Sequence, residues 1–129
     1  MEFCHDYFRR TGYRNDVFDV GFRVGKDPNS LLSYTYDGTR ITIDPVSTAP
    51  EGWNDFLVAY NEFCSGHGGC PLFNQTPFLT YEQVQKALGP RLEKFVDYRK
   101  RFDPGDRLLS PYFSALLGAN ITASAGQRG

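Results

Sequence analysis

Hydrophobic and polar residues alternate most regularly between Val17 and Val24. Phe18, Val20, Phe22 and Val24 share one face of this segment, and Asp19, Gly21 and Arg23 share the other. A period of two is typical of a β-strand with one buried face, so we expect the apolar face to enter a core. The polar row faces solvent in most strands of this kind, and the other interpretation is that it lines a pocket.

A second β region follows a Gly/Pro/Asn-containing loop over residues 25–29. Residues 31–36 are predicted as a short strand, and Asp37-Gly38 is a strong turn signal. Residues 39–44 then alternate, with Ile41 and Ile43 expected to point inward, and Pro45 is expected to end the strand. We therefore predict at least two strands, paired antiparallel in one sheet.

The period then changes to that of helices. Six residues repeat at helical spacing and predict a helix that packs on a sheet face, namely Trp53, Phe56, Leu57, Tyr60, Phe63 and Cys64. Shorter patterns predict helices over residues 3–10, 81–88, 91–102 and from Pro111 to about residue 117. Thr80 and Gln83 occupy the positions of a capping box. The predicted fold class is α+β, an antiparallel sheet packed against several helices.

The stretch from Gly68 to Pro77 carries almost no charge, although the chain as a whole is 22% charged. It places Asn74, Gln75 and Thr76 in a setting rich in Gly and Pro. Such a composition fits a buried, rigid connection between elements, and it also fits the wall of a ligand pocket. The residues themselves leave both interpretations open.

Composition narrows the class of protein. The chain has 129 residues and a formal net charge of −1, so it fits one domain without the basic surface expected for nucleic-acid binding. No apolar run is long enough to span a membrane, and the first residues lack a signal-peptide pattern, so we expect a cytoplasmic protein.

The three cysteines are poorly spaced for zinc and are expected to be free thiols, and no metal site is expected. His67 is expected to cap a helix or to be exposed.

Three patches, in order, carry a family resemblance. They are Gly21-Phe22-Arg23 followed by Leu32-Ser33, then residues 67–75, and then residues 98–110 with Asp103-Pro104-Gly105-Asp106 at their centre. Together the patches lie between residues 16 and 118. They resemble the C-terminal end of FAD-linked oxidases of the vanillyl-alcohol-oxidase/p-cresol-methylhydroxylase superfamily, in particular its sugar-lactone and alditol oxidase branch.

This resemblance implies that residues 1–118 are the C-terminal substrate or cap portion of a flavoprotein. The small and polar composition of residues 119–129 predicts a disordered tail. It implies FAD as cofactor, a separate FAD-binding domain as partner and a small-molecule alcohol as substrate. Arg23 and Gln75 would be catalytic, Arg23 and Asn74 would contact the cofactor, and Asp19, Asn74 and Ser110 would bind substrate. The chain starts inside an apolar pattern, which supports the expectation of a longer parent protein.

Departures from the family pattern limit what can be transferred. The family's acidic residue, His, Trp, Lys and final Asn fall here on Gly21, Leu72, Phe73, Gln75 and Ser110. The expected function is oxidation of a CH–OH group with hydride transfer to flavin and reoxidation by O₂ or another acceptor, and the chain is not expected to catalyse alone. The alternative is a non-catalytic binding or interaction module that keeps the fold without the flavin chemistry. A third hypothesis is a purely structural fragment with no function of its own.

Overall fold

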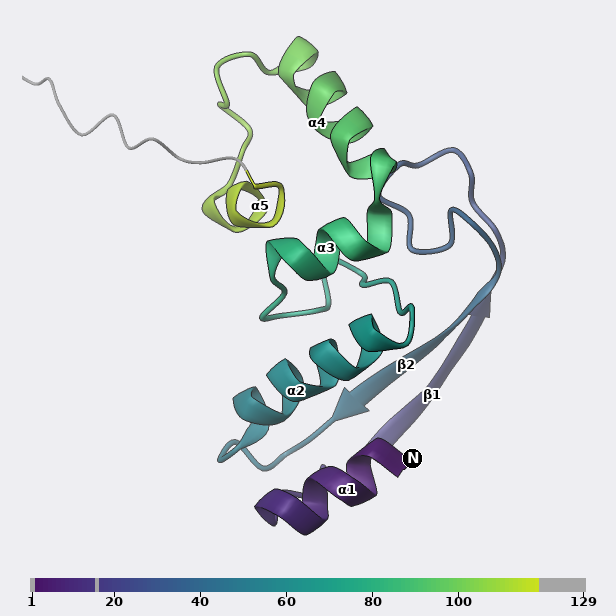
Figure 1. Cartoon of the computed structure of the whole chain (residues 1–129), viewed down its shortest axis with the longest axis vertical. Coiled ribbons are helices and arrows are strands. Elements are labelled where there is room, and N and C mark those ends of the chain that lie inside the picture. Colours follow the sequence, from purple (N-terminus) through teal and green to yellow (C-terminus); the bar gives the residue numbers. More distant parts are fainter. Residues whose placement is uncertain (1, 16, 119–129) are drawn as a thin grey trace, which may run out of the picture.

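The computed structural model describes residues 2–15 and 17–118. Within these ranges the elements follow in the order α1 (Glu2–Thr11), β1 (Val17–Val24), β2 (Arg40–Val46), α2 (Trp53–Gly66), α3 (Tyr81–Leu88), α4 (Pro90–Phe102) and α5 (Pro111–Leu116). Figure 1 shows α1 to α4 following one another along the long axis, with the β1–β2 ribbon beside α1 and α2. The predicted α+β class is confirmed. The predicted tail over residues 119–129 lies outside the described residues.

The sheet is a two-stranded antiparallel ribbon in which Val17 pairs with Val46 and Val24 with Arg40. The register shifts between Val20 and Arg23, which is a β-bulge. At this bulge Gly21 lies so close to Thr42 that an added Cβ would overlap the backbone of Thr42. The strand therefore needs glycine at the position where the FAD-linked family has an acidic residue.

Two predictions about the β region are wrong. Residues 31–36 form turns instead of a strand, and local bonds close them, such as that from the Ser33 N–H to the Ser30 carbonyl (2.9 Å). The connection between β1 and β2 is thus a long loop over residues 25–39 and not a tight hairpin. Pro45 lies inside β2, because a two-stranded ribbon leaves one edge of each strand open and proline needs no ladder partner there.

The apolar face of the ribbon is also not buried as predicted. Phe22 is 78% exposed and Ile41 is 68% exposed, and Ile43 is exposed as well. The side chains of residues 17–20 lie outside the description, so the expected burial of Phe18 and Val20 stays a prediction. A ribbon of two strands has too few neighbours to bury both faces, and no helix in the described ranges covers these residues closely.

Two small cores hold the helices together. The first joins α1 to α2, where Phe56 is 1% exposed and its ring lies 5.3 Å from that of Tyr7. The second joins α3, α4 and α5 through Val84, Leu88, Leu92, Leu116 and Leu117. The stripe of α2 is confirmed as core in its central residues, but it meets the aromatic face of α1 rather than a sheet face, because the ribbon is too narrow to cover it.

The predicted capping box at the start of α3 is confirmed. The Gln83 N–H donates to the Thr80 hydroxyl oxygen (3.3 Å), and the Thr80 N–H donates to the Gln83 side-chain oxygen (3.2 Å). His67 is the C-terminal cap residue of α2 and is exposed, as predicted. None of the helices in the described ranges has the length and apolar character that crossing a membrane requires.

Candidate functional site

One hollow of the described structure lies between β2, the C-terminal half of α2 and the loop that follows α2. Its volume is about 350 Å³, which falls within the usual range of small-molecule sites. β2 contributes residues 40–44, and the loop contributes residues 67–72 with Gln75 and Thr76. Tyr34, from the connection between the strands, closes part of the rim. The walls are therefore largely apolar, with a few polar groups among them.

The loop wall is fixed to α2 by backbone contacts. The Gly69 N–H donates to the Cys64 carbonyl (2.8 Å), and a Cβ on Gly69 would lie only 2.8 Å from the same oxygen. Further along, the N–H groups of Gln75 and Thr76 both donate to the Leu72 carbonyl, at 2.9 and 3.0 Å. The two interpretations of this stretch are thus compatible, because a tightly bonded connection also forms a wall of the hollow.

Buried Asn61 anchors the far end of the loop. This side chain of α2 is 7% exposed, and its amide nitrogen donates to the Pro77 carbonyl at 2.7 Å. Tyr60, one residue earlier, donates its hydroxyl to the Ile43 carbonyl of β2 (3.3 Å). Burial is the main reason that the pKa of Tyr60 is raised, and the neighbouring Cys64 raises it further, so this phenol stays protonated as a donor. Both walls of the hollow are therefore tied to α2.

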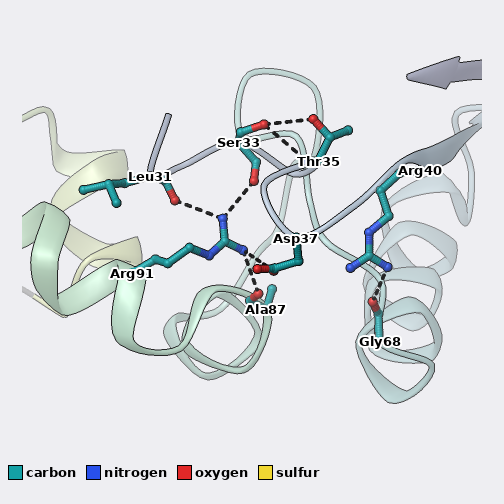
Figure 2. A network of polar contacts seen from close by, with 8 residues as sticks. All are labelled: Leu31, Ser33, Thr35, Asp37, Arg40, Gly68, Ala87 and Arg91. Carbon is teal, nitrogen blue, oxygen red and sulfur yellow. Dashed lines mark hydrogen bonds and ion pairs between the residues drawn. The ribbon is translucent and has the colours of Figure 1, made fainter. Parts of the chain in front are cut away.

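Arg91 of α4 holds the connection between the strands in place (Figure 2). Its Nη1 donates to the carbonyl oxygens of Leu31 (3.1 Å) and Ser33 (3.0 Å), and its Nη2 donates to a carboxylate oxygen of Asp37 (3.2 Å). The guanidinium also lies 4.4 Å from the ring centroid of Tyr36. Since residues 31–37 include Tyr34, Arg91 positions one rim of the hollow.

Arg40, at the start of β2, brings a positive charge to the hollow. Its Nη1 lies 3.5 Å from the carbonyl oxygen of Gly68, as Figure 2 shows. Burial raises the pKa of the nearby Cys70 thiol, while the charges of Arg91 and Arg40 act to lower it. The negative charge of Asp37 acts in the opposite direction on this thiol. Arg40 itself, a lining residue beside Gly68, places a positive charge at this end of the hollow.

Among the predicted site residues whose side chains the structure describes, one lines the hollow. Gln75, an exposed residue, lines it, whereas Asn74 and Arg23 are exposed as well and are not among its lining residues. Ser110 serves as the N-cap of α5, where its hydroxyl oxygen accepts a bond from the Phe113 N–H (3.3 Å). The side chain of Asp19 lies outside the description. The roles assigned to these residues by resemblance stay predictions.

Sequence reasoning missed Arg40, Tyr60 and Asn61. The alternation of residues 39–44 contained a signal for Arg40, because it places Arg40, Thr42 and Asp44 on one face of the strand. The prediction for this segment considered the other face, with Ile41 and Ile43 pointing inward, and gave no role to this one. Tyr60 and Asn61 lie in the predicted helix, but their bonds to β2 and to the loop depend on tertiary contacts that no local pattern shows.

The described residues offer no metal centre, since no three His, Cys, Asp or Glu side chains among them gather closely enough to hold an ion. Cys4, Cys64 and Cys70 are free thiols, as predicted. A comparison of the chain with known protein families, curated proteins and solved structures finds no match.

Proposed function

We propose that this chain is the C-terminal, substrate-side portion of an FAD-dependent oxidoreductase that oxidises a CH–OH group. The observation that carries the proposal is the hollow beside the loop 67–76, the stretch that resembles the flavin-facing loop of the FAD-linked oxidases. Ligand sites combine mostly apolar walls with a few polar groups, and this hollow has that character. Gln75 joins the two lines of reasoning, because both the resemblance and the geometry select it.

The lining residues fit one edge of a flavin. A carboxamide such as that of Gln75 can donate and accept hydrogen bonds, as the alternating carbonyl and N–H groups of the flavin pyrimidine edge require. The sequence contains no Gly-rich loop of the type that cradles phosphates, so a separate FAD-binding domain would hold the rest of the cofactor. A bound FAD would supply the acceptor for a hydride from the substrate carbon. O₂ or another acceptor would then take the two electrons from the reduced flavin.

The residues of the chain itself would bind and orient the substrate. Leu72 and Ile41 would offer apolar surface to its carbon skeleton. Gln75 would direct the hydroxyl-bearing carbon by hydrogen bonding. Arg23 and Asn74, predicted as cofactor contacts, lie outside the hollow, and their roles would depend on the FAD-binding domain lying against β1 and the loop.

A second candidate function is a non-catalytic interaction module. The exposed apolar side chains of Phe22, Ile41 and Ile43 favour it, because a ribbon with open edges and an apolar face offers a surface to another protein. The two candidates differ in one respect that is simple to measure, which is whether the protein retains a flavin.

The test expresses the chain joined to the polypeptide that the upstream DNA encodes in the same frame, and measures flavin absorbance after gel filtration. The proposal expects flavin to copurify with the protein. It also expects Gln75→Ala to slow anaerobic flavin reduction by an alcohol substrate. Gln85→Ala, which changes an exposed residue of α3, should leave the rate unchanged. A folded protein that retains no flavin would overturn the proposal in favour of the interaction module.

A further inference from the structure

The guanidinium of Arg40 has spare donor capacity. Within the part of the chain that the structure describes, its hydrogen bonding consists of one contact with the Gly68 carbonyl, at the long distance of 3.5 Å. A guanidinium carries five N–H donors, so most of its donors are available to a ligand. Arg91 differs, because it donates to three carbonyl oxygens as well as to the carboxylate of Asp37.

The carboxylates near the hollow do not neutralise Arg40. Asp37 is engaged by Arg91 at 3.2 Å. Asp44 also lines the hollow, but it lies four residues further along β2, which corresponds to about 13 Å along an extended strand. The two ends of the hollow therefore differ in charge, with the positive end next to the loop 68–72.

Much of the remaining lining of the hollow is apolar. Leu72 of the loop and Leu79 before α3 line the hollow, and so do the aromatic side chains of Tyr34 and Phe63. A ligand that fills this space must place carbon surface against these side chains, because an uncompensated polar group there would lose its hydration. A bare inorganic anion would satisfy Arg40 and leave the apolar wall unused.

We propose that Arg40 forms an anion subsite in the hollow, which selects a small carboxylate with an apolar body. Arginine suits this task because its planar fork matches the two oxygens of a carboxylate. The inference rests on the proposed function, which supplies the CH–OH group that reacts. A substrate with both that group and a carboxylate is a hydroxy acid, here one with an aliphatic or aromatic side chain. Such a substrate differs from the polyhydroxylated sugars of the oxidase branch that the sequence resembles.

Mandelate, an aromatic hydroxy acid, is a suitable probe, and mandelamide is its uncharged counterpart. Titration of the 129-residue chain, followed by amide resonances in NMR, gives the affinity for each compound without any flavin. Mandelate is expected to bind and mandelamide to bind at least tenfold more weakly. Arg40→Gln should weaken mandelate binding about tenfold or more, because a hydrogen bond to a charged group contributes at least that factor. Arg40→Lys should retain part of the affinity for mandelate, because lysine keeps the charge but not the planar fork.

Arg14→Gln is the control, because this substitution removes the same charge. Arg14 is exposed and does not line the hollow. Equal affinity of mandelate for the Arg40→Gln and Arg14→Gln variants would overturn the proposal. So would equal binding of mandelate and mandelamide, or binding of inorganic phosphate as tight as that of mandelate. The titration contains no flavin, so a negative result here is distinct from the absence of flavin that would overturn the proposed function.

Discussion

Arg91 gives the sharpest test of how the rim of the hollow is held. Its side chain is 11% exposed, and two of its acceptors are the backbone carbonyls of Leu31 and Ser33. In Arg91→Ala each carbonyl loses its donor in a partly buried setting, at about 1 kcal/mol or more apiece. The stacking on Tyr36 adds roughly 0.5–1 kcal/mol. The Asp37 pair adds about 0.5 kcal/mol at most, because that carboxylate is 61% exposed.

The expected cost of Arg91→Ala is therefore about 3 kcal/mol of the free energy of unfolding. Urea unfolding followed by circular dichroism measures it, and with a slope of about 1–3 kcal/mol per molar urea the midpoint should fall by roughly 1–3 M. Arg91→Lys keeps the charge but loses the planar fork, so its cost should lie in between. Arg101→Ala is the matched control on the same helix, because Arg101 is exposed and lies over the exposed Tyr98 ring. Equal midpoints for Arg91→Ala and Arg101→Ala would refute the reasoning.

Two further predictions concern the helix ends. Thr80→Ala should cost about 1 kcal/mol in urea unfolding, because it removes the capping box of α3, whereas Thr80→Ser should retain most of the stability. The Asp103 carboxylate accepts bonds from the N–H groups of Leu108 (2.9 Å) and Arg107 (2.8 Å), and these bonds hold the pKa of its carboxyl below the usual range. Its stabilising contribution is therefore present above about pH 4 and is lost as the pH falls through the lowered pKa, so the stability difference between wild type and Asp103→Asn should shrink in acid. A difference that stays constant in urea unfolding from pH 7 to below pH 3 would contradict this account.

The helices could be predicted because their signals are local. The stripe of α2 and the capping box at Thr80 depend on residues a few positions apart, and both features are present. Burial of the strands could not be predicted in the same way. Alternation shows which residues share a face, but whether Ile41 meets a core depends on what lies across from it. A two-stranded ribbon provides too few neighbouring side chains to bury it.

The lining of the hollow could also be predicted only in part from the sequence. The composition of Gly68 to Pro77 indicated an unusual segment, and Gln75 lies where a site residue should lie. Arg40 was not identified, because its position at the hollow depends on β2 lying beside α2, which the Tyr60 hydroxyl and the Gly68 carbonyl help to fix. The turns over residues 31–36 were misread as a strand for a related reason, since Arg91 binds them from 58 to 60 residues away along the chain.

The central claim is that the hollow beside the loop 67–76 receives a substrate for oxidation by a bound flavin. Anaerobic mixing of the flavin-containing protein with mandelate and related hydroxy acids, followed by absorbance, tests it most directly. The account predicts that the absorbance of the oxidised flavin is lost on mixing, and that Gln75→Ala slows this loss while Gln85→Ala does not. Oxidised flavin that persists with every alcohol and hydroxy acid tried, or equal rates for the two glutamine variants, would contradict the account.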